Sequence, residues 1–441
     1  MTHVINNTTN IDREKIDQLK RILKELHQGK SIDELREKFK SILKNVKPWD
    51  VPIIEQELVR EGISILDIFR MCDLHVELFR EILIPQSLKD TPEGHPLAAL
   101  INENNEVLKD AEKLSLYARS LTKAKDKVEF LKSLLKNLKE LGGIRKHFMR
   151  EQLLVFPYLE KRGITAVPRV LWSKQDRVVH MIKKVTVQVT ELLNDQKVDE
   201  RDLEQLREQL LELSRALINM VFRENNILYP TLNVLLSEGE WHAIKEGEEL
   251  IGYFKVKPNN EWQPKADPIY PYQLKSEIGQ GHIKQLSRGV RGFLKGSSEK
   301  DLYELIRPND LELGSGYLSL EEIDAILRTL PVDISFVDKD DKLRYYSEKE
   351  ERVFVRTKTV LGRPVELCHP PRSVHIVKRI INEFKAGKRN IAEFWINMRG
   401  KLIYIKYLPV RDRNGNYLGT LEVVQDITEI KRIEGEKRLL D

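Results

Sequence analysis

Residues 146–158 read KHFMREQLLVFPY, and residues 220–230 repeat the pattern as MVFRENNILYP. In both stretches a Glu precedes an apolar run that ends in an aromatic residue and a Pro, and the Pro lies six residues after the Glu. His147 lies four residues before Glu151, so on a helix the two side chains share one face, one turn apart. Helical bundles hold iron or manganese with His and carboxylate side chains on such inward faces. The two stretches therefore predict bundle helices around a metal site whose ligand set is incomplete.

The composition indicates a globular, charge-rich protein. The chain has 441 residues, of which 41% are hydrophobic and 32% are charged, and this length allows two or three domains. Its 74 basic and 69 acidic residues nearly balance, which argues against a nucleic-acid partner. No segment approaches the roughly 20 apolar residues of a membrane helix, and residues 1–13 lack the apolar core of a signal peptide. Cys72 and Cys368 lie far apart in sequence, which suits a reducing compartment, so we expect a cytoplasmic protein without a membrane partner.

The first 250 residues carry helical patterns of two kinds. Residues 11–86 have the periodicity of short amphipathic helices. Residues 96–250 carry four longer patterns, which predict an up-down four-helix bundle. These patterns cover residues 96–121, 125–159, 168–193 and 199–236. Pro157 and Pro230 are expected to end or kink the helices that hold the two repeated stretches.

The remainder of the chain has a different pattern. Prolines and glycines interrupt every periodicity from residue 253 to about 310, which predicts a linker. Short strands and helices follow, and Asn414-Gly415 is a strong hairpin signal, so an α+β layout with an antiparallel sheet is expected. The predicted strands cover residues 333–338, 343–346, 391–398, 402–410 and 417–425, and the predicted helices cover 318–330 and 374–384. A final charged helix is expected over residues 427–440.

Four passages carry a resemblance to a known family. They are residues 55–58 (EQEL) with 72–75 (CDLH); 94–96 (GHP) with Glu103-Asn104; the stretches around His147 and Glu224; and the C-terminal set 330–334 (LPVDI), 368–371 (CHPP), 393–396 (EFWI), 419–422 (GTLE) and 426–428 (DIT). Together they resemble a prokaryotic family in which a helical domain of unknown function (number 438) precedes a hemerythrin-like HHE cation-binding bundle and a PAS sensor domain. The resemblance covers nearly the whole chain.

The resemblance implies a multidomain fold, with an all-α N-terminal part and a hemerythrin-like four-helix bundle, followed by an α+β PAS domain with an antiparallel sheet. The implied limits are 11–86 for the N-terminal helical domain, 90–252 for the bundle, 253–314 for the linker, 315–430 for the PAS domain and 431–441 for a C-terminal helix.

The resemblance also implies a non-haem iron site, because hemerythrin-like proteins hold two irons with side chains from all four helices. The matching positions are His95, His147, Glu151, Glu224, Glu103 and Asp176, and His180 lies one turn after Asp176. Three positions depart from the pattern: Ala98, Gln175 and Met220 stand where relatives have His. The remaining ligands fit one metal or a carboxylate-rich pair. The alternative is that these side chains satisfy one another by hydrogen bonds without metal.

PAS domains hold small ligands such as haem or flavin between sheet and helices, or hold nothing and dimerise. His375, at the start of the predicted helix 374–384, matches the place of an axial haem ligand, and Cys368 and His369 are further candidates. The alternative for His375 is a helix-capping or surface residue. The cysteine-containing signature of photoactive, flavin-binding PAS domains is not visible.

These observations favour a sensor or signalling protein over an enzyme. The bundle is expected to respond to oxygen, nitric oxide, redox state or iron, and the PAS domain to relay that state to a downstream partner that the sequence does not identify. A homodimer through the PAS domain or the C-terminal helix is expected, since Ile427, Ile430 and Ile433 repeat at helical spacing. The alternatives are a di-iron carboxylate redox enzyme and a metal-free interaction scaffold.

Overall fold

The structure, a computed structural model, forms two compact units, one ending at Glu304 and the other beginning at Leu305. It describes residues 17–26, 28–39, 41, 46–80, 83, 88, 91–123, 126–194, 199–259, 261–274, 305–349, 352–369 and 371–437. Within these residues, no helix is both long and apolar enough to cross a membrane.

The N-terminal helices of the first unit pack directly on the bundle. They include α2 (Ile32–Lys38), α4 (Asp50–Arg60) and α5 (Ile65–Arg80). Their apolar core also takes in Val170 and Ile227 from the bundle. Gln56 Oε1 accepts hydrogen bonds from the backbone N–H groups of Thr165 (2.9 Å) and Ala166 (2.8 Å). Gln56 of α4 therefore caps the bundle helix that begins at Ala166, because the first N–H groups of a helix have no partner within it.

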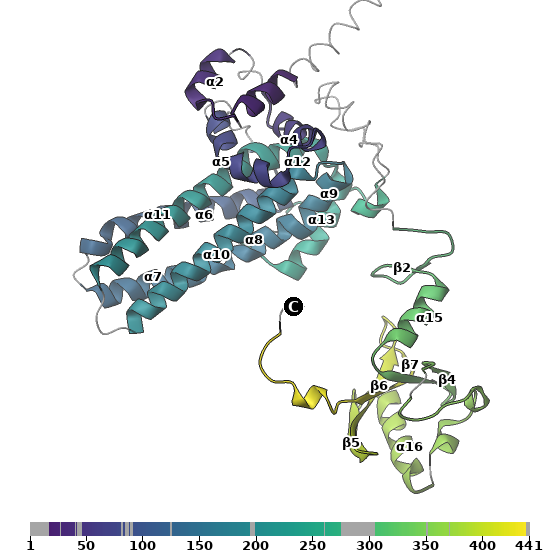
Figure 1. The fold of residues 1–441 in the computed structure, drawn as a ribbon. Helices are drawn as coiled ribbons and strands as arrows, with labels where there is room; N and C mark the ends of the chain where they lie inside the picture. Colours follow the sequence, from purple (N-terminus) through teal and green to yellow (C-terminus); the bar gives the residue numbers. More distant parts are fainter. Residues whose placement is uncertain are drawn as a thin grey trace, which may run out of the picture. The chain divides into compact units, whose positions relative to one another are not determined.

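Four long helical segments form the bundle and run side by side (Figure 1). The first is α6 (Pro96–Ser120), extended by η2 (Leu121–Lys123). The second comprises α7 (Lys127–Leu141), η3 (Gly142–Ile144), α8 (Arg145–Arg150), η4 (Glu151–Val155) and α9 (Phe156–Lys161). The third is α10 (Ala166–Asn194), and the fourth comprises α11 (Glu200–Arg223), η5 (Glu224–Leu228) and α12 (Tyr229–Leu235). One continuous apolar core joins all four segments, as the sequence predicts.

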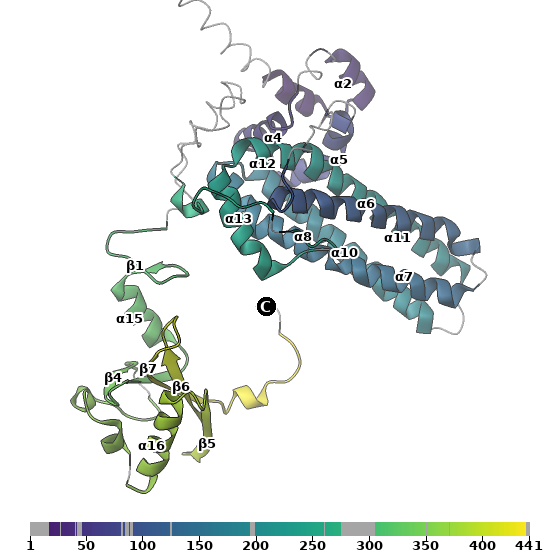
Figure 2. The ribbon, with the colours of Figure 1, turned by 180° about the vertical axis from the view of Figure 1, so that it is seen from behind.

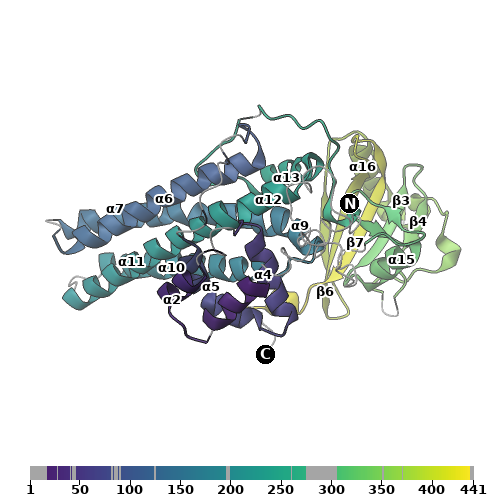
Figure 3. The same ribbon diagram turned by 90° about the horizontal axis from the view of Figure 1, so that it is seen from above.

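The prediction of a linker from residue 253 was wrong for the part that the structure describes. A further helix, α13 (Glu238–Ile251), follows the fourth segment, and the chain then stays on the bundle through η6 (Pro271–Gln273). Phe254 is buried in the bundle core, and Trp262 packs against that core. Figure 3 shows α13 lying along the bundle. Prolines interrupt the helical pattern here, but the aromatic side chains still bury apolar surface.

The second unit is α+β, as the sequence predicts. A two-stranded ribbon of β1 (Leu311–Glu312) and β2 (Tyr317–Leu318) precedes α15 (Leu320–Thr329). An antiparallel sheet follows in the order β4-β3-β7-β6-β5. Its strands are β3 (Asp333–Asp338), β4 (Leu343–Tyr346), β5 (Ala392–Met398), β6 (Lys401–Arg411) and β7 (Tyr417–Asp426). The helices between β4 and β5 are η8 (Lys358–Val360), η9 (Val365–Cys368) and α16 (Pro371–Lys385), and α16 packs on the sheet (Figure 2).

The predicted C-terminal helix is absent from the described residues. A single 3₁₀ turn, η10 (Ile430–Arg432), follows β7, and residues 433–437 are not helical. Ile430 and Ile433 are exposed, so they bury little apolar surface. Gly435 has a φ of 73°, which is not helical. A short helix without packing partners is marginal in water, which accounts for the difference.

Candidate metal centre

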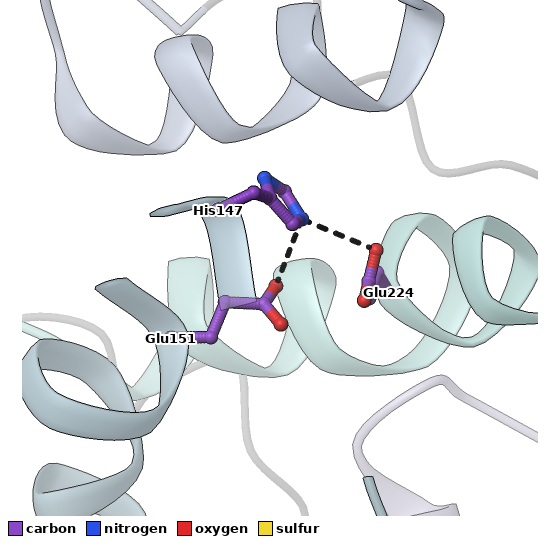
Figure 4. Close-up of side chains that lie close together, drawn as sticks. All are labelled: His147, Glu151 and Glu224. Carbon is purple, nitrogen blue, oxygen red and sulfur yellow. Dashed lines mark ion pairs between the residues drawn. The ribbon is translucent and has the colours of Figure 1, made fainter. Parts of the chain in front are cut away.

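Three buried side chains from two bundle segments converge on one point (Figure 4). His147 Nε2 lies 3.8 Å from Glu151 Oε1 and 3.5 Å from Glu224 Oε2. The three side chains offer one nitrogen and two oxygen atoms that all lie within 4.8 Å of one another. None of them is more than 1% exposed. The structure thus brings together the three residues that the repeated stretches contribute.

The repeated Glu–Pro spacing has a structural consequence. Each stretch forms one π-helical turn, in which the N–H of Phe156 or Tyr229 bonds to the carbonyl of Glu151 or Glu224, five residues earlier. Pro follows one residue later and has no N–H to give to an α-helical bond. Each helix therefore widens into a π turn before its proline and then continues. The expectation that Pro157 and Pro230 end or kink the helices was wrong in this respect. Such π turns are frequent at functional sites, and here both begin at a Glu of the cluster.

Glu224 forms an ion pair with His147 but accepts no hydrogen bond among the described residues. Its side chain is nevertheless buried, at 1% exposed. Asn104 Oδ1, also buried, is unpartnered in the same sense, while its Nδ2 donates to Tyr229 Oη at 3.3 Å. Buried carboxylates are normally paired or bound to a metal, because leaving them without partners is costly. One imidazole and two carboxylates form a donor set that suits iron or a similar divalent ion.

The electrostatics of the cluster favour an added cation. Burial by itself lowers the pKa of His147, but the carboxylates of Glu103, Glu224 and Glu151 outweigh this effect and raise the pKa to about 10. Burial and the nearby charge of Glu224 raise the pKa of Glu151 to about 8. Without a metal, protons therefore compensate the excess negative charge. Metal ligands bind in their deprotonated forms, so a metal ion would replace these protons.

Glu103 contacts the nitrogen of His147 that does not face Glu151 and Glu224. One of its oxygens, Oε2, lies 2.7 Å from His147 Nδ1 and accepts a hydrogen bond from Arg150, while Oε1 accepts the backbone N–H of Phe254 at 2.5 Å. Such a carboxylate fixes the tautomer of the imidazole and aims its other nitrogen at a metal. The sequence placed Glu103 among the ligands; in the structure it orients His147.

Arg150 places a fixed positive charge next to Glu103. Its guanidinium is 1% exposed and donates to Glu103 and, at 2.7 Å, to Glu248 of α13. The group also lies 4.6 Å from the centre of the Tyr253 ring. Sequence reasoning missed Arg150, Glu248 and Tyr253 as parts of the site, because their contacts join residues far apart in sequence.

Two further side chains hold Glu151, and both were missed as partners. Tyr229 Oη donates to Glu151 Oε1 at 2.7 Å and lies 3.4 Å from His147 Nε2. Gln175 Nε2 donates to Glu151 Oε2 at 2.6 Å. Tyr229 could have been found from the sequence, because it is the aromatic residue of the repeated aromatic-Pro pattern. Gln175 was noted only as a lost His, but its amide fills that place with a hydrogen bond.

Comparisons with known proteins agree with this architecture. A model described as Hemerythrin HHE cation binding domain matches residues 95–232, one described as Family of unknown function (DUF438) matches residues 19–84, and one described as PAS domain matches residues 323–428. The chain thus contains the three domains in the order that the resemblance implies. A hemerythrin domain combined with a PAS domain supports a role in sensing or signalling.

Solved structures with likeness to the chain include a C-terminal domain from Streptococcus mutans, which is 40% identical over 29% of this chain and 100% of that one, with a TM-score of 0.28. A PAS domain from Colwellia psychrerythraea is 19% identical over 25% and 98% of the two chains, with a TM-score of 0.21. A sensory box sensor histidine kinase from Vibrio cholerae is 17% identical over 24% and 91%, with a TM-score of 0.19. No curated protein matches the chain.

The other predicted ligands of the hemerythrin domain lie outside the cluster. Asp176 and His180 are exposed on α10, whose inward residue at this level is Gln175. His95 is buried at the start of α6, where its Nδ1 accepts the N–H of Leu97 at 3.1 Å and caps the helix.

The three positions that depart from the hemerythrin pattern have different surroundings. Ala98 is half-buried on α6, Met220 is buried on α11 one turn before Glu224, and Gln175 bonds to Glu151. Ala98 and Met220 contribute no nitrogen or oxygen ligand from their side chains. The described cluster therefore holds donors for one ion and lacks those of a histidine-rich pair.

The PAS domain contains a cavity of about 320 Å³ between its sheet and α16. Cys368 and His369 line this cavity, and the His369 Nδ1 lies 2.9 Å from the Val365 carbonyl. His375 is exposed and is not among the described residues that line the cavity. The residue with the best sequence match to an axial haem ligand is thus not placed to be one.

Proposed function

We propose that the chain is a sensor whose hemerythrin domain binds one non-haem iron ion at His147, Glu151 and Glu224. The observation that carries the proposal is the buried carboxylate of Glu224, which faces His147 without a hydrogen-bond partner among the described residues. Bound iron would supply a redox change and a place for oxygen or nitric oxide to bind. A cytoplasmic location, predicted from the sequence, belongs to this proposal.

One ion fits the side chains better than two. The oxygens of Glu103 already accept from Arg150, the backbone of residue 254 and the imidazole of His147. Arg150 also places a permanent positive charge beside Glu103, and like charges repel, which disfavours a second cation bound by Glu103. This arrangement argues against the di-iron carboxylate enzyme.

The surrounding residues have distinct tasks in such a site. Glu103 holds the His147 ring so that Nε2 faces the two carboxylates. Tyr229 holds a proton on its hydroxyl, since burial and the charges of Glu151 and Glu224 raise its pKa well above the ordinary value. A proton donor beside the ligands can hydrogen-bond to a small polar molecule that enters the site. The buried apolar core around the cluster excludes bulk water.

The metal-free scaffold is the second candidate. Tyr229 and Gln175 satisfy Glu151 without any ion, which favours this candidate. The two functions differ in the role of Glu224, which is a metal ligand in the first and an ion-pair partner of His147, at 3.5 Å, in the second.

Relay to the PAS domain completes the proposal. A ligand shifts a two-state equilibrium only if it binds the two states with different affinity. We propose that the states differ in the contacts of a homodimer formed by the PAS domain, whose edge strand β5 exposes Trp395. The downstream partner would recognise one of these states.

The test is metal analysis and an optical spectrum of the full chain, purified without tag or chelator, together with Glu224→Gln. The matched control is Glu212→Gln on the same helical segment, where the carboxylate is exposed and pairs with Arg177 at 2.8 Å. We expect about one iron per chain in the natural protein and in the control, and background iron in Glu224→Gln. Two irons per chain with oxygen-dependent turnover would favour the enzyme instead. Absence of iron, with stability unchanged by chelators, would leave the scaffold.

A further inference from the structure

A polar pocket of about 290 Å³ lies apart from the metal cluster, in the groove between α10 and α11. Arg215, Asn219 and Arg223 line it from α11 and follow one another at intervals of four residues, so they share one helix face. Lys174 and Arg177 line it from α10 and are three residues apart, so they also share a face. The packing of the two helices therefore brings basic side chains from both into one pocket.

Two of these cations are almost fully buried and share one carboxylate. Lys174 is 7% exposed and Arg223 is 4% exposed. Lys174 Nζ lies 2.9 Å from one oxygen of Asp73 on α5, and Arg223 donates to the other oxygen. Lys174 Nζ also lies 4.5 Å from the centre of the Phe69 ring. These contacts hold two charged donors in fixed places, which reduces the entropy lost when an anion binds beside them.

Two further arginines of the pocket are exposed. Arg177 donates to Glu212 at 2.8 Å, but both side chains are about half exposed, and exposed ion pairs are weak. Arg215 Nε donates to the Leu211 carbonyl at 3.4 Å. Its two terminal nitrogens have no hydrogen-bond partner among the residues that the structure describes. An anion that enters the pocket can therefore accept from Arg215 without displacing a carboxylate.

The charges of the described lining do not balance. Four cations stand against two carboxylates, which leaves a net charge of +2: Lys174, Arg177, Arg215 and Arg223 against Asp73 and Glu212. A single group compensates this charge if it is a dianion. A phosphate monoester carries a charge of about −1.5 to −2 near neutral pH and has three strong acceptor oxygens. The guanidinium fork matches phosphate geometry, so the lining favours this group.

The size of the pocket leaves room for more than the phosphate itself. A cavity of about 150 Å³ in another protein holds the six heavy atoms of benzene. The volume here, about 290 Å³, is nearly twice as large. Val178, Ala216 and Met220 give part of the wall an apolar surface, against which carbon atoms of an ester can pack.

We infer that the pocket between α10 and α11 binds a small phosphate monoester. Its phosphate group accepts hydrogen bonds from Arg215 and the neighbouring cations, and its carbon body lies against the apolar part of the wall. Because Asp73 belongs to the N-terminal helices and the other lining residues to the bundle, the ligand would bind where these two parts of the chain meet. The inference does not depend on iron binding by the hemerythrin domain.

Three probes test the charge and the source of the phosphate: glycerol 3-phosphate, inorganic phosphate and dimethyl phosphate. Isothermal titration of the full chain in low salt, at about pH 8, keeps the first two as dianions, while dimethyl phosphate has one charge. Glycerol 3-phosphate should bind severalfold more tightly than inorganic phosphate, and dimethyl phosphate about tenfold more weakly than inorganic phosphate. The inference is overturned if neither dianion gives a heat of binding, if dimethyl phosphate binds as tightly as they do, or if free phosphate binds more tightly than the ester.

Arg215→Gln tests the pocket by removing a cation that pairs with no described carboxylate. It should weaken the binding of glycerol 3-phosphate about tenfold. Arg207→Gln is the matched control, because Arg207 lies on the same helix, bonds to Glu204 and does not line the pocket. This variant should bind like the natural chain. Equal affinities in the two variants would place the ligand elsewhere.

Glu212→Gln tests the same charge balance in the opposite direction. It removes one of the two carboxylates of the lining, so the net charge rises to +3 and glycerol 3-phosphate should bind severalfold more tightly. A folding defect cannot produce such a gain, so this variant separates loss of the pocket from loss of the fold. An affinity at or below that of the natural chain would overturn the inference.

Discussion

Two buried histidines of one hemerythrin domain have opposite surroundings. His147 lies among three carboxylates, which raise its pKa to about 10. His95 lies between two tryptophan rings, with centroids 4.9 Å and 4.4 Å away, and burial together with the charge of Lys245 lowers its pKa to about 4. Without a metal, the same side chain is therefore a cation at one position and a neutral helix cap at the other. Neighbours that are distant in sequence decide which role a histidine takes.

Removing each imidazole in turn tests the difference between the two histidines most directly. His147→Ala should reduce the iron content of the purified chain to background, because the cluster loses its only nitrogen ligand. His95→Asn should leave the iron content unchanged, since Asn also caps helix N-termini. Metal analysis of both variants beside the natural chain checks this. Loss of iron in His95→Asn, with the fold intact by circular dichroism, would place His95 back among the ligands.

The dependence of stability on pH should reveal the neutral state of His95. The folded-state pKa of His95 is depressed to about 4 from an ordinary value of 6.5, so the unfolded chain takes up the proton more readily. The stability that the neutral imidazole contributes is complete above pH 6.5 and is lost as the pH falls toward 4, by about 3 kcal/mol in total. Denaturant unfolding at several pH values should show this loss in the natural chain and a smaller one in His95→Asn. Parallel pH profiles of the two proteins would contradict the assignment.

A third change adds the missing histidine to the second stretch. Met220 is buried one turn before Glu224, in the position that His147 holds relative to Glu151. Met220→His should tighten iron binding by about tenfold, equal to about 1.4 kcal/mol, by supplying another nitrogen ligand. Competition with a chelator of known affinity measures the change. An affinity equal to that of the natural chain would mean that position 220 does not face the ion.

The smallest expected effect concerns the π turn. Pro157→Ala restores an N–H one residue after the turn and allows the helix to tighten toward α geometry, which would rotate Glu151 away from His147. Iron binding should weaken severalfold while thermal stability does not fall. The same chelator competition tests it, with Pro168→Ala near the start of α10 as a control outside the π turns. Equal affinities in both variants would separate the π turn from metal binding.

Most of the fold could be predicted from the sequence. Apolar periodicity located the bundle helices and the alternating pattern located the sheet, because these signals are local and repeat along one element. The helix α13 and the segment around Phe254 were missed because they have glycines and prolines, and their stability comes from packing on a distant core. The C-terminal helix was overpredicted for the opposite reason: its pattern is regular, but the described part has little to pack against.

The site was readable only in part. Spacing within one helix paired His147 with Glu151, and the repeated pattern added Glu224. Spacing could not show that Gln175 and not Asp176 points inward, because adjacent helical residues differ by about 100° in direction and the orientation is set by packing. The roles of Arg150 and Glu103 depend on contacts between residues about fifty to one hundred and fifty positions apart.

The hydrogen bond from residue 254 to Glu103 has a consequence for how this site tolerates mutation. Its donor is a backbone N–H, so every substitution at position 254 except proline leaves the donor in the chain. A substitution of the side chain can loosen the packing of the segment, but it does not remove the N–H group that donates to Glu103. The orientation of the imidazole is in this respect protected from most single-residue changes at that position.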